Sequence, residues 1–286
     1  MLISIGDIIK KTVEIYKNHF WVVLKYLVLA LLPGIFGAIM TSYLFKSAAD
    51  MGSYDKTIIY IGIPLVTIIY IILIILSIWF YFALIKVINC LYNNTPVTTE
   101  RDMLIDTRHI IVKGAITSIL SGLYSGWPLL IFMIAILSRI YYTDYLSTFV
   151  STALTIVLFC WMVYAVLHLT YYSISLIFSV FITVLENKPA KEALAESQKR
   201  VAGRWWDIAL RVVVPVFVIY AVLLVIDIIF ATVAHFTGDV GNMISSIIDI
   251  IINYLAMPAA LTVGVILYNE TKNVPAIIEQ QAVDVN

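Results

Sequence analysis

The chain has 286 residues, 62% of them hydrophobic and 13% charged, with a formal net charge of zero and a mean hydropathy of +0.99. A soluble domain is nearer ~45–50% apolar and ~25% charged, so this composition excludes an ordinary soluble domain and favours a bilayer as the solvent. The neutral charge balance does not point to nucleic acid as a partner. The chain has two cysteines, which are too few for a disulfide framework or a zinc site of cysteines.

Six stretches are apolar over the ~20 residues that a helix needs to cross a hydrocarbon core of ~30 Å. They cover residues 20–44, 57–88, 114–138, 146–185, 208–235 and 243–268. A polar, amphipathic segment precedes the first stretch, so we expect that stretch to stay in the protein rather than to be cleaved as a signal. The sequence predicts an all-α, polytopic membrane bundle, with one six-span domain over residues 1–272 and a cytoplasmic tail over residues 273–286.

The fourth stretch, residues 146–185, has no formal charge over about forty residues, or ~60 Å of helix. That is too long for one upright span. Either the helix tilts and projects into the cytosol, or it breaks near the polar run from Leu169 to Ser173. We favour projection.

The lysines and arginines predict the orientation, because these residues are retained on the cytoplasmic side of a membrane. On the predicted topology only Lys46, Lys56 and Arg139 fall on the outer side, whereas all the other lysines and arginines fall on the inner side. We therefore expect a plasma-membrane protein with both termini in the cytoplasm.

Three segments on the cytoplasmic side have an apolar stripe at helical spacing among basic residues: residues 3–20, 98–113 and 189–204. Ser4 and Asp7 are placed to cap the first, and Pro189 stands at the start of the third. Such basic amphipathic helices tend to lie in the plane of the lipid headgroups. Each segment precedes two spans, so the chain reads as three copies of an interfacial helix followed by a hairpin.

The third of these segments lies in a recognisable pattern. The residues from Ser179 to Trp206 read SVFITVLENKPAKEALAESQKRVAGRWW, and the N-terminus, SIGDIIKKTVEIYKNHFW, looks like a matching opening segment. Together they resemble a broad group of poorly characterised six-span bacterial and archaeal membrane proteins, which includes the membrane domain attached to some glycerophosphodiester phosphodiesterases. The resemblance implies a fold. It does not carry over the phosphodiesterase activity, because that chemistry belongs to a separate soluble barrel for which this chain has no room.

Ionisable groups within spans are costly and are therefore candidates for function. Asp227 and Asp249 are predicted at similar depth on consecutive spans, and Asn253 lies one turn from Asp249. These carboxylates could share a proton or hold a cation. The alternative, which we favour, is that they pair with Arg139 or face a shallow wet vestibule, since neither reaches the midplane.

His168 is predicted in the inner half of the fourth span, beside Tyr171 and Tyr172. A lone histidine at such a position most often hydrogen-bonds to a neighbouring helix, although a proton relay or a ligand role is the alternative. In the third span Gly114, Ser118, Gly122 and Gly126 recur every four residues, as in seams where helix backbones approach each other closely.

The sequence contains no phosphate-binding loop, no His-Glu-x-x-His motif and no nucleophile elbow, and its four histidines have no metal-ligand spacing. We therefore expect no catalytic residues, cofactor or metal. The leading hypothesis is a non-enzymatic scaffold or accessory protein, with the lipid bilayer and another membrane protein as its candidate partners. The alternative is a transporter or lipid-handling protein that uses Asp227, Asp249 and Asn253. An intramembrane enzyme using His168 and a carboxylate is disfavoured, because their predicted depths differ by more than ~10 Å.

Overall fold

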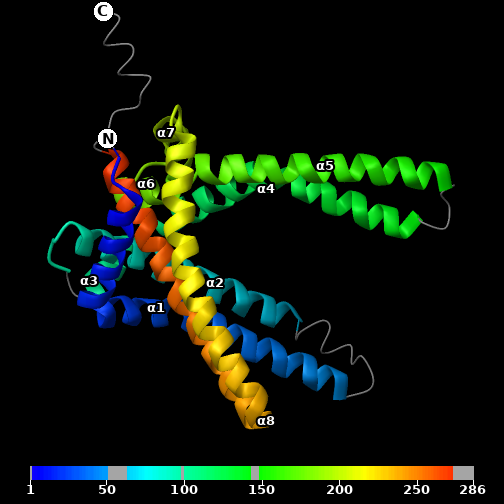
Figure 1. The fold of residues 1–286 in the computed structure, drawn as a ribbon, viewed down its shortest axis with the longest axis horizontal. Coiled ribbons are helices and arrows are strands. Elements are labelled where there is room, and N and C mark those ends of the chain that lie inside the picture. The colour runs from blue at the N-terminus through cyan, green and yellow to red at the C-terminus, as the bar shows by residue number, and fades with distance from the viewer. Residues whose placement is uncertain (1, 51–62, 98–99, 143–147, 273–286) are drawn as a thin grey trace, which may run out of the picture. The chain divides into compact units, whose positions relative to one another are not determined.

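The computed structural model describes residues 2–50, 63–97, 100–142 and 148–272, without the side chains of 34, 38–50, 63, 100, 141–142, 148–149 and 233–255. Every regular element in these ranges is an α-helix (Figure 1). The helices are α1 (Ile5–Asp50), α2 (Ile63–Tyr92), α3 (Glu100–Arg108), α4 (Ile111–Tyr142), α5 (Thr148–Ser175), α6 (Ser179–Glu186), α7 (Ala190–Val201) and α8 (Trp205–Lys272).

Five stretches among the described residues are long and apolar enough to cross a membrane: Ile5–Gly37, Pro64–Tyr92, Ile111–Ile140, Val150–Glu186 and Trp205–Thr232. They match the first five predicted spans in order. Residues 57–62, which we expected at the start of the second span, lie outside the described residues. This all-helical arrangement is that of a multi-pass membrane protein.

The contacts divide the chain into two compact units. Unit 1 comprises residues 1–112 and 211–270, and unit 2 comprises residues 113–210 and 271–286. The single domain predicted over residues 1–272 thus contains two sets of helices, and each is described separately below.

Helix α1 begins with the predicted cap and contains a break that divides its polar part from its apolar part. The Ser4 hydroxyl accepts a hydrogen bond from the Asp7 backbone N–H at 3.1 Å and donates one to the Asp7 carboxylate at 2.6 Å. His19 has non-helical angles (φ −130°, ψ 25°), which kink the helix where the amphipathic segment meets the apolar stretch. The two predicted segments, 3–20 and 20–44, are therefore joined in one kinked element.

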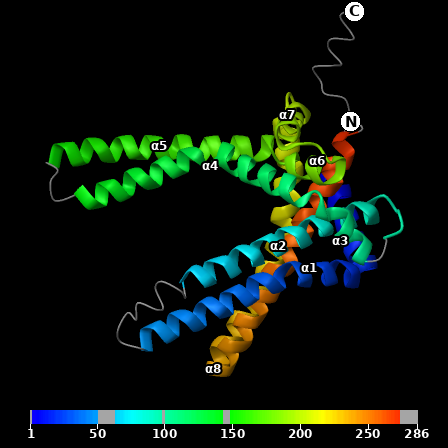
Figure 2. The same cartoon turned by 180° about the vertical axis from the view of Figure 1, so that it is seen from behind.

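Unit 1 is built on the α1–α2 pair, with α3 packed against α2. Polar side chains hold α3 in place. The Trp79 indole N–H lies 2.9 Å from the Leu104 carbonyl oxygen and 3.0 Å from the Thr107 hydroxyl, and Lys86 forms an ion pair with Asp106. Figures 1 and 2 show α1 and α2 side by side along their length.

Helix α8 reverses direction within unit 1. Arg211 donates a hydrogen bond to the Ile3 carbonyl at 2.8 Å, and Glu270 pairs with Lys11 at 3.2 Å. A straight helix would place Arg211 and Glu270 about 90 Å apart, whereas the eight residues from Ile3 to Lys11 span at most ~29 Å even when extended. The chain must therefore turn back between these contacts, and Figure 1 shows the yellow limb descending and the orange-to-red limb returning.

In unit 2, the stretch predicted as the fourth span is divided. Helix α5 ends at Ser175 and α6 begins at Ser179, so the stretch is not one unbroken helix, whereas its projection into the cytosol stays a prediction. The break lies beyond the polar run Leu169–Ser173, and a side chain of α7 stabilises it. The buried Ser197 hydroxyl accepts a hydrogen bond from the Phe178 N–H at 3.2 Å and donates one to the Ser175 carbonyl at 2.9 Å.

The apolar stripe of α7 is covered by protein. Ala193, Leu194, Ser197 and Val201 are buried, and α7 packs against α6 and α5. The stripe therefore does not need lipid to cover it, which removes the physical reason for placing this helix in the headgroup plane.

Candidate functional site

His168 is held between α4 and α5 by aromatic rings and one polar contact. Its Nδ1 lies 3.3 Å from the carbonyl oxygen of Ser125, on the neighbouring helix α4. Its ring centre lies 4.5 Å from that of Tyr172, with the two rings tilted by 33°, and it meets Trp127 edge-on at 5.5 Å. Trp161 adds a hydrogen bond from its indole N–H to the Pro128 carbonyl at 2.9 Å. These contacts join the two helices of the hairpin and give the imidazole a structural role.

The other predicted candidates lie in α8. Asp227 is half-buried in the descending limb, in unit 1, between the exposed residues Ile226 and Ile228. Asp249 and Asn253 are on the helical backbone of α8, but their side chains lie outside the described residues. His168 belongs to unit 2, so the structure does not bring the four candidates together as one described site.

The most extensive polar cluster of unit 1 lies elsewhere, where α1, the end of α2 and the end of α8 meet. Lys11 Nζ lies 3.2 Å from both the Tyr92 hydroxyl and a Glu270 carboxylate oxygen, and the Tyr92 hydroxyl donates to the same oxygen at 2.7 Å. The neighbouring residue Asn269 donates an amide N–H to Asn89 Oδ1 at 2.8 Å. Three segments that are distant in sequence are thus tied together at the end of unit 1 that contains the N-terminus.

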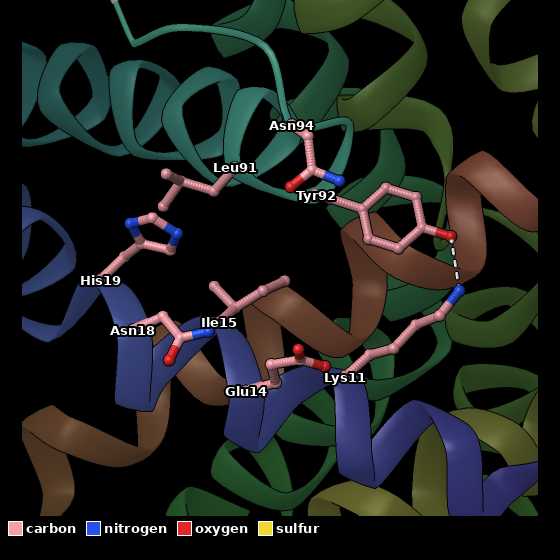
Figure 3. Close-up of a pocket in the computed structure, with 8 residues that line it drawn as sticks. All are labelled: Lys11, Glu14, Ile15, Asn18, His19, Leu91, Tyr92 and Asn94. Carbon is pink, nitrogen blue, oxygen red and sulfur yellow. Dashed lines mark hydrogen bonds between the residues drawn. The ribbon is translucent and has the colours of Figure 1, made fainter.

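A cavity of about 320 Å³ opens beside this cluster, and we call it the kink pocket (Figure 3). One wall comes from α1 on the N-terminal side of its break, and the other from the last turn of α2 and the loop that follows. The two walls face each other across open space in Figure 3. The lining residues are Lys11, Glu14, Ile15, Asn18, His19, Leu91, Tyr92 and Asn94.

Local sequence explains why Asn94 faces the pocket. It adopts a left-handed conformation (φ 52°), which asparagine tolerates better than most residues. Its N–H bonds to the Leu91 carbonyl at 3.3 Å, and the Thr95 N–H bonds to the Cys90 carbonyl at 2.9 Å. This pair of bonds is a Schellman motif, which ends α2 and turns the chain at the rim of the cavity.

A second charged cluster lies in unit 2 and closes the α6–α7 turn. Arg200 binds Glu186 at 2.7 Å and Glu196 at 2.6 Å, and Lys188 bridges the same two carboxylates. Hydrogen bonds from Lys188 and Arg200 lower the pKa of Glu196, although partial burial opposes the shift. Because these charges are paired with one another, we interpret this cluster as structural.

The kink pocket presents charged and hydrogen-bonding side chains to any ligand that enters it. No group of three or more histidine, cysteine, aspartate or glutamate side chains suited to a metal occurs among the described residues. Sequence reasoning missed this pocket because Lys11 and Glu14 read as the solvent-facing side of an amphipathic helix. The break at His19 and the asparagines after α2 were the available signals, but only the fold brings them together.

Comparisons with known proteins give no relative from which a function could be transferred. No protein-family model, curated protein or solved structure matches the chain.

Proposed function

We propose that the chain is a six-span protein of the plasma membrane, with both termini in the cytoplasm, which acts without enzymatic chemistry as a scaffold or accessory protein for another membrane protein. The distribution of lysine and arginine supports the orientation. The reversal of α8 between Arg211 and Glu270 supports a sixth span, because it returns the chain to the segment that contains Ile3 and Lys11. The resemblance to six-span proteins agrees with this topology.

The observation that carries the accessory role is the exposure of the α4–α5 hairpin. Only 11% of the most apolar window of each of these two candidate spans is buried. Large apolar side chains such as Ile134, Leu137 and Phe159 are more than half exposed. A transporter needs its spans packed around a polar pathway, whereas these two helices offer apolar surface to lipid and to the helices of another protein.

The experiment is site-specific photocrosslinking in cells. A crosslinking amino acid is placed at the exposed residues Ile134 and Phe159 and, as matched controls on the same hairpin, at the buried residues Leu158 and Ala165. We expect one discrete protein adduct from the exposed positions, identified by mass spectrometry, and none from the buried positions. The partner's own abundance should fall in cells that lack the chain. Lipid adducts alone at every exposed position would refute the accessory role.

Transport or lipid handling is the second candidate, and the position of Asp227 among exposed apolar residues is the observation that favours it. A carboxylate in such surroundings is expensive and is often retained for function. This alternative predicts proton-coupled or ligand flux in liposomes that is abolished by Asp227→Asn and by Asp249→Asn. Flux that is the same in the wild type and in both variants would exclude it.

A further inference from the structure

The kink pocket lies where the chain passes from a polar to an apolar segment. His19 breaks α1 at this boundary, and Phe20 and Trp21 follow as an edge-to-face pair at 5.5 Å, with Trp21 78% exposed. Exposed aromatic residues at the end of a span prefer the level of the lipid headgroups. The cavity that begins at His19 is therefore placed to receive a headgroup rather than an acyl chain.

The charge of the pocket favours a cation. Lys11 is already paired with Glu270, so its charge is largely compensated. Glu14, by contrast, makes no hydrogen bond or ion pair with any other residue in the described part of the chain. Among the described residues that line the cavity, its carboxylate is the one uncompensated formal charge, and an ammonium group is its natural complement.

The remaining polar side chains suit a phosphate next to that ammonium. Asn18 and Asn94 offer amide groups that can accept from an ammonium or donate to a phosphate, and His19 offers an imidazole N–H. None of these three side chains has a hydrogen bond within the described residues, so their capacity is available to a ligand. The volume of about 320 Å³ lies within the ~300–1,000 Å³ of small-molecule sites.

The pocket also distinguishes a primary from a quaternary ammonium. A quaternary ammonium has no N–H to donate and is usually bound by the faces of several aromatic rings. In the described part of the lining, Tyr92 is the only aromatic side chain apart from His19, and the Lys11 ammonium already lies 5.0 Å from the centre of its ring. A primary ammonium, in contrast, could donate hydrogen bonds to Glu14 and to the amide oxygens.

From these observations we propose that the kink pocket binds the headgroup of an aminophospholipid of the phosphatidylethanolamine class. Glu14 accepts hydrogen bonds from the primary ammonium. The amides of Asn18 and Asn94 accept from the ammonium through their oxygens and donate to the phosphate through their N–H groups. His19 also donates to the phosphate. Ile15 and Leu91 form the apolar walls. This assignment does not depend on the accessory role, and it remains valid if the photocrosslinking experiment finds no protein partner.

The test uses the full chain in mild detergent and native mass spectrometry. Three short-chain probes are titrated separately: dihexanoyl phosphatidylethanolamine, phosphatidylcholine and phosphatidylglycerol. We expect the ethanolamine lipid to bind at least tenfold more tightly than the other two. Glu14→Gln and Asn18→Ala should each remove most of this preference, whereas Glu192→Gln, an exposed glutamate in the first turn of α7, should keep it.

Equal binding of the three lipids by the wild type would overturn the proposal, and so would an undiminished preference in Glu14→Gln. Glu14 has no hydrogen bond or ion pair within the described residues, so the unfolding midpoint of Glu14→Gln should equal that of the wild type, and this measurement separates lost binding from misfolding. Free phosphoethanolamine, used as a competitor, tests whether the pocket binds a lipid headgroup or a soluble compound with the same groups. Weak competition by phosphoethanolamine supports a lipid as the ligand. Competition as strong as that of the short-chain lipid would overturn this assignment in favour of a soluble ligand.

Discussion

Replacing Ser197 by alanine should loosen the junction between α5 and α6. The hydroxyl is fully buried, accepts a hydrogen bond from the Phe178 N–H and donates one to the Ser175 carbonyl. Leaving a buried backbone group unpaired costs about 1–3 kcal/mol, and the better helix propensity of alanine returns about 0.5 kcal/mol. Two groups lose a partner, and at about 1.5 kcal/mol each, in the lower part of that range, the net loss at this junction is about 2–3 kcal/mol.

Hydrogen exchange followed by mass spectrometry measures this loss directly. In the full chain in detergent, a local destabilisation of about 2–3 kcal/mol corresponds to roughly 30- to 150-fold faster exchange in the segment 176–178. Ser173→Ala is the matched control, because Ser173 is exposed and its hydroxyl has no hydrogen bond within the described residues. Unchanged exchange in Ser197→Ala, or the same acceleration in the control, would refute the role that we assign to Ser197.

Three further predictions concern charge and helix packing. Arg200→Met leaves Glu186 and Glu196 without their guanidinium partner. It should therefore lower the unfolding free energy by about 1–3 kcal/mol in an SDS titration. An unchanged unfolding midpoint would show that the cluster is not structural. Because the pKa of Glu196 is lowered, mainly by the Lys188 hydrogen bond, its stabilising contribution is present above its unfolded value of 4.5 and is lost as the pH falls through the folded value. The unfolding temperature should therefore fall on acidification below about pH 4.5, and less steeply in Glu196→Gln. Gly122→Ala should leave stability unchanged or raise it by up to about 1 kcal/mol, since nothing lies within 4 Å of the added Cβ; a loss of stability would show that this face is packed.

Local patterns in the sequence predicted the helices well. The alternation of apolar and polar stretches predicted six spans, and the described residues contain five helices long and apolar enough to match the first five of them. The Ser4–Asp7 cap was predicted correctly from the four residues that form it. The change from amphipathic to apolar character near Phe20 coincides with the break at His19.

Features that depend on contacts between distant segments were not predicted. The break between α5 and α6 is stabilised by Ser197, about twenty residues further along the chain, so no pattern within residues 146–185 indicates its position. From the sequence we expected the apolar stripe of α7 to face lipid, whereas in the structure α5 and α6 pack against this helix. Gly122 read as part of a packing seam, but its face is open in the described structure. The kink pocket combines residues 11–19 with residues 91–94, and only the fold brings them together.

The number of spans is the central claim, because the placement of both termini on one side of the membrane depends on it. An even number places both ends of the chain on one side of the membrane, and an odd number places them on opposite sides. Single cysteines at Ser4 and Lys272, in a chain whose Cys90 and Cys160 have been replaced by alanine, can be labelled with a membrane-impermeant maleimide. Six spans predict that both sites react in inside-out vesicles and neither in right-side-out vesicles. Labelling of the two sites from opposite sides would contradict the account.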